Sequence, residues 1–277
     1  MAEVFQTLGI IAGNGAYPRT FAREARRAGV ERLVAAAFKG ETEEDLVSMV
    51  DSLDWFRVGQ LGKLIRFFKK EGVGKAVMVG QIAPRNLFDV IPDLRTINLL
   101  RKLKTKNAES IFGSIADELA SDGIELIPAT TYLDDYLPAA GHVHGPPLDE
   151  SGLADADYGF GIAKEVSRLD IGQTVVVKNG TVLAVEAFEG TNEAMKRGGK
   201  LGKGKAVMVK VSKPRQDLRF DVPVVGPLTV EAAAEAGVRA IIIEAGSTLL
   251  LESERVAELC RAHKITIQAV DNLQTDG

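Results

Sequence analysis

Cysteine, histidine and tryptophan are scarce in this chain, which holds one Cys, three His and one Trp among 277 residues. A single cysteine excludes an internal disulfide and a cysteine-based structural zinc site. Cys260 lies in an apolar helical pattern, which predicts a buried thiol. Three histidines are too few for a His-rich two-metal phosphoesterase centre. Two of them form the pair His142 and His144 in a Gly- and Pro-rich stretch, which we interpret as a connection between domains.

Long apolar runs and an excess of positive charge are also missing. No run approaches the roughly 20 residues that span a bilayer, and the first residues have no basic segment typical of a signal peptide. These features predict a cytoplasmic protein. The net charge is −4, so we expect no nucleic-acid partner, and any anion must be bound by local groups.

The apolar pattern predicts an α/β fold of two domains. Apolar strands alternate with helical stretches closed by glycine up to about residue 127, which indicates an N-terminal Rossmann-like parallel sheet. The second half combines a hairpin at Asn179-Gly180 with further strands and helices, which predicts a C-terminal mixed α/β domain. We expect domains at 1–130 and 156–277, with 131–155 as the linker and the catalytic acid in the second domain.

Two Gly-containing turns follow apolar strands of the first domain. Gly13, Asn14 and Gly15 come after the first strand and before a helix, an arrangement whose backbone N–H groups suit a phosphate. Gln81 follows Gly80 at the end of a later strand, so it is expected at the same sheet edge. The turn departs from the dinucleotide fingerprint, since Pro18 replaces its last glycine and no acid ends the second strand. A nicotinamide-dependent oxidoreductase is therefore disfavoured.

Carboxylates near turns and clustered cations mark the second half. The acids are Asp170, Glu186, Glu189 and Asp221, and hard cations such as Mg²⁺ bind one or two carboxylates together with substrate phosphates. Cations at 196–205 alternate with glycines, which indicates either a flexible basic loop over phosphates or a mobile connection. In the first half, five cations at 95–106 flank an apolar helical stripe, which indicates either a membrane-facing helix or an ordinary solvated surface.

Together these motifs resemble the LpxI-type UDP-2,3-diacylglucosamine pyrophosphatases of lipid A synthesis, from about Leu8 to Val270. The matching pieces are Gly9-Ile-Ile-Ala-Gly-Asn-Gly15, Gly59-Gln-Leu-Gly-Lys63, Ala154-Asp-Ala-Asp157, Arg168-Leu-Asp-Ile-Gly-Gln173, Val182-Leu-Ala-Val-Glu-Ala-Phe-Glu-Gly-Thr191, Lys213-Pro-Arg-Gln-Asp217, Arg219-Phe-Asp-Val-Pro223 and Glu244-Ala-Gly246.

The resemblance implies hydrolysis of the substrate pyrophosphate to UMP and 2,3-diacylglucosamine 1-phosphate, with Mg²⁺ as cofactor and Mn²⁺ as an alternative. It implies a substrate held between two α/β domains and Asp221 as the residue most needed for turnover. We expect Asp221, Glu186 and Glu189 as metal ligands. We expect Gly13, Asn14, Gly15, Gln81, Asp170, Thr191 and Lys213 as substrate contacts.

Other readings remain open at this point. A nucleotide-sugar or lipid-phosphate binding protein without chemistry would use the same residues, with the acids pairing the basic segments. The partners expected are a lipid-linked nucleotide sugar and the inner leaflet of a membrane, touched peripherally, and a homodimer is left open.

Overall fold

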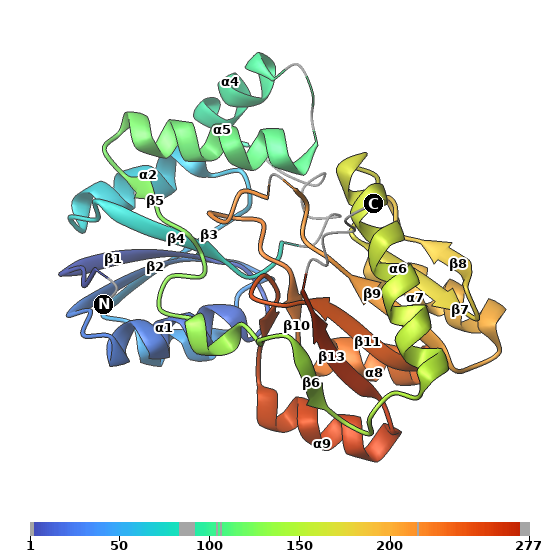
Figure 1. The fold of residues 1–277 in the computed structure, drawn as a ribbon. Coiled ribbons are helices and arrows are strands. Elements are labelled where there is room, and N and C mark those ends of the chain that lie inside the picture. The colour runs from blue at the N-terminus through green and yellow to red at the C-terminus, as the bar shows by residue number, and fades with distance from the viewer. Residues whose placement is uncertain (1–2, 83–91, 104, 106, 215, 272–277) are drawn as a thin grey trace. The chain divides into compact units, whose positions relative to one another are not determined.

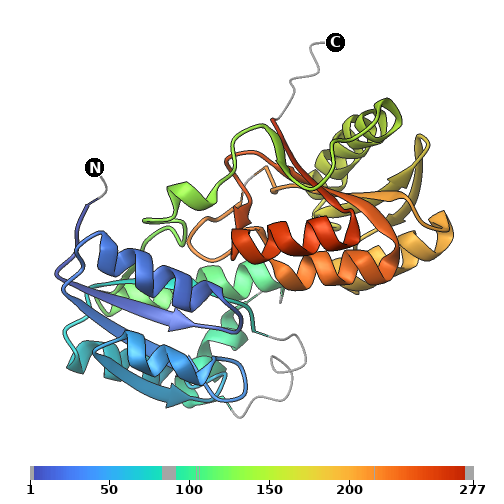
Figure 2. The ribbon, with the colours of Figure 1, turned by 90° about the horizontal axis from the view of Figure 1, so that it is seen from below.

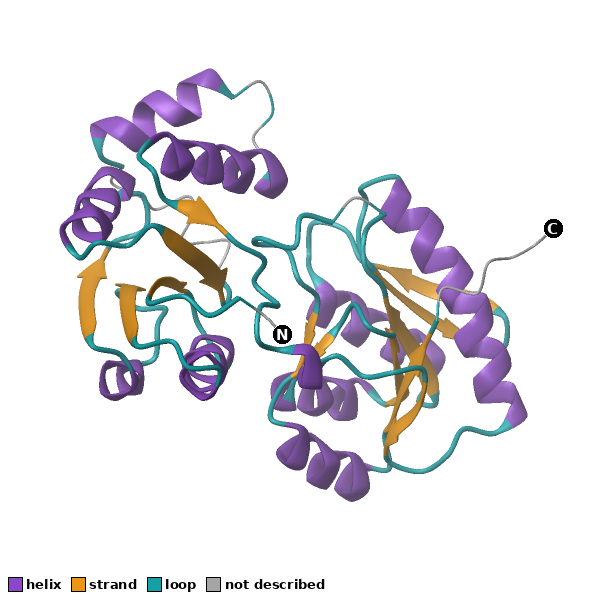
Figure 3. Cartoon of the chain, turned by 60° about the vertical axis from the view of Figure 1, so that its left-hand side comes forward, coloured by secondary structure: helices purple, strands orange, loops and turns teal. Residues whose placement is uncertain are grey.

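The computed structural model describes residues 3–82, 92–103, 105, 107–214 and 216–271, and it divides the chain into two compact units. Unit 1 is Met1–Asp134 together with Asp217–Asp221, and unit 2 is Asp135–Gln216 together with Val222–Gly277. Figure 1 shows the elements of each, and Figure 3 shows strands layered between helices in each unit. Three stretches of the predicted basic and Gly-rich motifs, at 83–85, 104 with 106, and 215, lie outside the described residues.

Unit 1 is built on a five-stranded parallel sheet of order β3-β2-β1-β4-β5. Its strands are β1 (Thr7–Ala12), β2 (Arg32–Phe38), β3 (Ser52–Phe56), β4 (Lys75–Val79) and β5 (Glu125–Leu126). Its helices are α1 (Tyr17–Arg27), the 3₁₀ turn η1 (Glu44–Met49), α2 (Leu61–Lys70), α4 (Leu94–Lys102) and α5 (Ala108–Ser121). Strands β1 and β2 are apolar and buried along almost their whole length, as expected for strands covered on both faces. The predicted parallel sheet is confirmed.

Helices cover both faces of this sheet. Helix α1 lies on one face, and α2, α4 and α5 lie on the other (Figure 1). The second face holds a core cluster that includes Phe56, Phe68, Leu99 and Leu119. Edge strand β3 was not foreseen, because Ser52 and Asp54 interrupt its apolar pattern.

Unit 2 is built on a six-stranded mixed sheet of order β6-β13-β11-β9-β7-β8. Its strands are β6 (Gly141–His144), β7 (Thr174–Lys178), β8 (Thr181–Val185), β9 (Ala206–Lys210), β11 (Val238–Glu244) and β13 (Thr266–Val270). A separate parallel pair joins β10 (Val224–Val225) and β12 (Leu249–Leu250). The sheet is parallel at β9, β11 and β13 and antiparallel at β6, β7 and β8, which confirms the predicted mixed domain.

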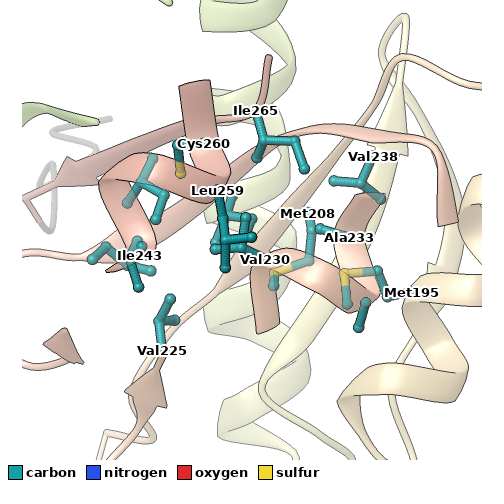
Figure 4. Packing of buried hydrophobic residues seen from close by; sticks show 14 of the residues in the cluster. Met195, Met208, Val225, Val230, Ala233, Val238, Ile243, Leu259, Cys260 and Ile265 are labelled. Atoms are coloured by element: carbon teal, nitrogen blue, oxygen red, sulfur yellow. The ribbon is translucent and has the colours of Figure 1, made fainter. Parts of the chain in front are cut away.

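The helices of unit 2 separate onto the two faces of its sheet. Helix α6 (Glu150–Arg168) covers one face, and α7 (Thr191–Gly202), α8 (Pro227–Ala236) and α9 (Ser253–His263) cover the other. Helices α8 and α9 lie side by side (Figure 2). Met208 packs beside Val230 and Ala233 in the core cluster that also holds Cys260 (Figure 4), while its neighbours Val207 and Val209 face α6, as the two-residue period of a strand requires.

The type I′ hairpin is confirmed, since φ is +49° at Asn179 and +66° at Gly180. The predicted linker differs, because 131–155 contains strand β6 and the first turn of α6. The two histidines of that linker lie on β6, where the His144 Nε2 lies 2.8 Å from the Ser253 hydroxyl.

The predicted flexible basic loop is wrong for most of its length, because 191–202 is helix α7. Its glycines serve close packing rather than flexibility. A Cβ built on Gly198 would lie 2.5 Å from Val176, and one on Gly199 would lie 1.8 Å from the carbonyl oxygen of Ala236. A helix that runs this close to β7 and α8 accepts only glycine at these positions.

Candidate functional site

In unit 1, the turn after β1 passes backbone to backbone against the turn after β4. The Gly13 N–H donates to the Val79 carbonyl at 2.8 Å. Asn14 and Gln81 then pair as an isolated antiparallel bridge, with hydrogen bonds of 2.8 Å and 3.3 Å between their N–H and carbonyl groups. This confirms that the two predicted turns share one edge of the sheet.

Glycine is required where the two turns cross. A Cβ built on Gly13 would lie 2.5 Å from the Gln81 carbonyl oxygen, and one on Gly80 would lie 2.7 Å from that of Asn14. Gly80 also has φ of +91°. The N–H groups of Gly13 and Asn14 were expected to face a phosphate, and the structure differs because both are used in the crossing. Gly15, with φ of +88° and open space around its Cβ position, stays the predicted phosphate contact of this turn.

The start of helix α1 follows directly and is anchored by Tyr17. Its hydroxyl donates to the Ala129 carbonyl at 2.8 Å, and burial raises the pKa of this phenol well above its ordinary value. Ala16 occupies the N-cap position without a side-chain cap, and Pro18 supplies a preset first turn. The turn is therefore held from both sides, by β4 and by the chain after β5.

In unit 2, polar side chains gather at the carboxyl edge of the parallel strands. Lys210 ends β9, and its register partner Thr174 begins antiparallel β7. Glu186 follows β8, whose last residue, Val185, pairs with Val175. Because β7 runs antiparallel to both β9 and β8, the start of β7 meets the ends of β8 and β9 at the edge where Lys210 lies.

Glu186, Thr191 and Lys210 form one hydrogen-bonded cluster at this edge. The Thr191 hydroxyl donates to a Glu186 carboxylate oxygen at 2.8 Å, and the Lys210 ammonium donates to the Thr191 hydroxyl at 3.2 Å. The other Glu186 oxygen accepts the Gln173 N–H at 3.4 Å. The structure thus brings two predicted residues together and adds Lys210, which sequence reasoning missed. The signal was a lysine directly after the buried run Ala206–Val209.

Glu189 lies in the same segment but is engaged differently. Its carboxylate accepts a hydrogen bond from Arg197 at 2.6 Å and another from the Ala187 N–H at 3.2 Å. Its own amide and the Arg197 guanidinium hold the pKa of this carboxyl below its usual range. Glu186 accepts hydrogen bonds from the Thr191 hydroxyl and the Gln173 N–H, whereas Glu189 is paired with the Arg197 guanidinium, so Glu186 is the better candidate for a hard cation.

Lys213 and Asp170, both predicted as substrate contacts, form an ion pair in unit 2. Their side chains meet at 2.6 Å, and the Lys213 N–H donates to the Gln216 side-chain carbonyl at 2.6 Å. Asp170 has φ of +55°, an uncommon conformation for a residue other than glycine. Because half of the Asp170 side chain is exposed, an incoming phosphate can compete for the lysine.

Asp221 belongs by its contacts to unit 1, although the sequence placed it in the C-terminal domain. The Ala129 N–H donates to the Leu218 carbonyl at 2.7 Å, and the Phe220 ring lies 5.7 Å from that of Phe112 on α5. The Asp221 N–H closes the segment on the Asp217 carbonyl at 2.9 Å. The short segment Asp217–Asp221 therefore departs from its sequence neighbours to pack its aromatic ring on unit 1.

Within the described residues, no three His, Cys, Asp or Glu side chains converge into a ready-made metal site. A cation held by one or two carboxylates, with substrate phosphates completing its shell, does not need such a group. Glu186 suits that role because its carboxylate is held by the Thr191 hydroxyl and the Gln173 N–H rather than by an arginine, as Glu189 is. The metal thus stays a prediction.

The predicted basic amphipathic helix is α4, and its residues divide into two sets. Leu99 is buried, and Leu100 packs against the same core, while Leu94 is exposed. Arg95 is not a free surface cation, because it pairs with Glu118. The exposed cations of the helix are Arg101 and Lys102. Across the described ranges, no helix combines the length and the apolarity needed to cross a membrane.

A cavity of about 180 Å³ opens between α6 and β13 in unit 2, with Phe160, Val270 and Gln268 in its lining. Sites for drug-sized ligands measure roughly 300–1,000 Å³. This cavity is therefore too small to hold a diacylated nucleotide sugar.

Comparison with known proteins gives one consistent family. Residues 7–136 match the model of the LpxI N-terminal domain, and residues 139–268 match that of the LpxI C-terminal domain. The chain is 31% identical over 260 residues to the UDP-2,3-diacylglucosamine pyrophosphatase LpxI of Caulobacter vibrioides, covering 90% of this chain and 92% of that protein.

Solved structures share much less with this chain. The biotin carboxylase domain of Hydrogenobacter thermophilus 2-oxoglutarate carboxylase is 13% identical, covers 65% of this chain and 36% of its own, and gives a TM-score of 0.28. The biotin carboxylase subunit of a pyruvate carboxylase is also 13% identical, covers 67% and 36%, and gives 0.27. The chain thus spans about a third of those proteins, and values this low carry no argument. The two domain models and the full-length relative show that the chain belongs to the LpxI family.

Proposed function

We propose that this protein hydrolyses the pyrophosphate bond of UDP-2,3-diacylglucosamine, giving UMP and 2,3-diacylglucosamine 1-phosphate in lipid A synthesis. One observation carries the proposal: the match to a UDP-2,3-diacylglucosamine pyrophosphatase runs over 90% of the chain rather than over one domain. The cations and carboxylates at the carboxyl edge of unit 2 support it, because a diphosphate needs both positive charge and a way to orient water.

The reaction is a displacement at the α-phosphorus. A water oxygen forms a bond to that phosphorus, and the bond from the α-phosphorus to the bridging oxygen breaks. The electron pair stays on the bridging oxygen, which leaves as part of the lipid phosphate, and the proton of the water passes to solvent. We propose that Asp221 orients this water, and that Lys210 and Lys213 neutralise the charge that builds on the phosphate oxygens.

Bound Mg²⁺, or Mn²⁺ in its place, would draw electron density from the phosphorus and neutralise the diphosphate. Glu186 is the first carboxylate proposed to hold it, Asp221 stays a predicted ligand, and Glu189 fits less well because it already pairs with Arg197. Thr191 fixes the Glu186 carboxylate through its hydroxyl. Gly15 and Gln81 are proposed as contacts of the nucleotide.

The experiment is hydrolysis of UDP-2,3-diacylglucosamine in detergent micelles, with and without Mg²⁺, in water enriched in ¹⁸O. We expect metal-dependent release of UMP that carries the label, because attack at the α-phosphorus places the new oxygen there. Label in the lipid phosphate would refute the site of attack. Binding of the intact substrate without any product would favour the non-catalytic binding protein instead.

Three variants assign the carboxylates. Asp221→Ala should keep the fold and substrate binding while losing most of the turnover, and near wild-type turnover would remove Asp221 from its role. Glu186→Gln should raise the Mg²⁺ concentration needed for half-maximal activity. Glu189→Gln is its matched control in the same segment and should leave that concentration close to the wild-type value.

A further inference from the structure

A mostly buried ion pair lies beneath the end of strand β9 in unit 2. Lys164 on α6 donates to both carboxylate oxygens of Glu244, at 3.0 and 3.1 Å. The Lys164 side chain is 20% exposed and that of Glu244 is 9% exposed. Glu244 ends β11, so the pair ties a helix on one face of the sheet to the carboxyl edge.

The pair also binds both backbone groups of Ser212. The Ser212 N–H donates to Glu244 at 2.7 Å, and the Ser212 carbonyl accepts from Lys164 at 3.2 Å. The residue before it, Val211, donates its N–H to the Gln173 carbonyl at 3.0 Å. The backbone is therefore fixed immediately before Lys213.

Two buried polar atoms next to Lys213 lack a hydrogen-bond partner among the described residues. They are the Ser212 hydroxyl oxygen and the side-chain nitrogen of Gln216. Gln216 uses its other side-chain atom, the carbonyl oxygen, to accept the Lys213 N–H. Buried polar groups are nearly always satisfied, so two such atoms flanking one lysine call for a missing partner.

Stability alone is a weak reason to keep this arrangement. Removing two charges from water is costly, and a buried ion pair often contributes no more than apolar residues of the same size. An ion pair that also holds both backbone groups of Ser212 instead limits where the next side chain can be.

We propose that Ser212, Lys213 and Gln216 form a phosphoryl-binding turn, and that Lys164 and Glu244 are positioning residues that hold it in shape. A phosphoryl oxygen is the partner that suits a hydroxyl, an amide N–H and an ammonium together. This inference rests on the proposed function, since the diphosphate of the substrate supplies that oxygen.

The first test is a double-mutant cycle on kcat/KM for UDP-2,3-diacylglucosamine. Glu244→Gln should lower kcat/KM roughly 10-fold to 100-fold, the size expected when a binding group is misplaced by about 1 Å. Because Glu244 acts through Lys213, the same change should have little further effect in Lys213→Ala. If the double variant lost kcat/KM by the product of the two single-variant losses, the positioning role of Glu244 would be overturned. Should Glu244→Gln fail to fold, Lys164→Met takes its place in the cycle.

Asp149→Asn is the matched control. Asp149 pairs with Arg239 at 3.1 Å, and Arg239 lies near the start of β11, at the opposite end from Glu244. Asparagine keeps the hydrogen bond that caps α6 through the Gly152 N–H. This variant should leave kcat/KM unchanged. A loss as large as that of Glu244→Gln would mean that any ion pair of unit 2 matters equally, which overturns the proposal.

The second test uses Ser212→Ala and inorganic pyrophosphate, and it does not depend on turnover. If the hydroxyl binds a phosphoryl oxygen, its removal should weaken the Kd for pyrophosphate about 5-fold or more, without lowering Tm. If the hydroxyl is only an unsatisfied group, Tm should rise and the Kd should stay the same, which refutes the turn as a binding site. Absence of hydrolase activity would refute the proposed function. The Kd for pyrophosphate would still show whether Ser212 belongs to a phosphoryl-binding turn.

Discussion

Replacing Gly13 by alanine tests whether the crossing of the two turns in unit 1 is a packing requirement. The added Cβ would lie 2.5 Å from the Gln81 carbonyl oxygen and 2.8 Å from the Gln81 nitrogen. Favourable contacts of carbon atoms lie at roughly 3.5–4.0 Å, so the intrusion is about 1 Å. Both neighbouring atoms belong to backbone, which cannot rotate away as a side chain would.

The expected cost has two parts. Overpacking of this kind costs roughly 1–3 kcal/mol. Separation of the turns also weakens the two hydrogen bonds between Asn14 and Gln81, each worth about 1 kcal/mol net. The sum of about 2–5 kcal/mol should lower the Tm of unit 1 by roughly 4–20 °C, at about 2–4 °C per kcal/mol.

Gly113→Ala is the control, measured by the same thermal unfolding followed by circular dichroism. Gly113 lies within α5 of the same unit, and its Cβ position has no atom within 4 Å. Alanine should raise stability there by roughly 0.8–1 kcal/mol through helix propensity alone. A Gly13→Ala protein with wild-type Tm but without hydrolase activity would refute the packing argument. It would favour the original prediction that Gly13 contacts a substrate phosphate.

Further predictions concern pH, thiol reactivity and membranes. Burial acts to raise the pKa of Asp93, but hydrogen bonds from Thr96 and from the backbone N–H groups of Gly62 and Lys63 together outweigh it, and the net pKa falls below the ordinary 3.8. Asp93 therefore contributes stability above about pH 4, and this stability is lost as the pH falls through the folded-state pKa. The Asp93→Asn variant should show a smaller fall in Tm between about pH 5 and 3. An unchanged dependence of Tm on pH would contradict this. Burial raises the pKa of the Cys260 thiol to about 11, so iodoacetamide at about pH 8 should label it only after denaturant is added, and rapid labelling of the native protein would count against the core position. Arg101→Gln with Lys102→Gln should weaken flotation with anionic vesicles at low salt at unchanged Tm, and undiminished binding would retire α4 as a membrane contact.

Local pattern was enough for most of the elements. The β7–β8 hairpin lies at the Asn179-Gly180 turn that the sequence predicted, because the turn residues and the β-branched runs beside them mark it locally. Strands β10 and β12 were missed because two residues each are too short to show a period.

The candidate site residues divide in the same way. The sequence pointed to Glu186, Thr191 and Lys213 as candidates, because each lies in or beside a Gly- or Pro-containing turn with charged residues, a pattern that the sequence shows directly. It missed Lys210, whose neighbours at the sheet edge come from β7 and α7. It also missed the pairing of Lys164 with Glu244, which lie 80 residues apart.

By itself, the sequence determined the class of fold, the position of the turns and, through motifs along the whole chain, the family. Those features depend on neighbouring residues and on their periodicity. Only the tertiary structure decided that Gly13 serves a backbone crossing, that the glycines of α7 serve packing, and that the segment carrying Asp221 packs with unit 1. Such facts arise from contacts between segments distant in the chain, and a linear pattern does not specify which backbone will lie within 3 Å of which.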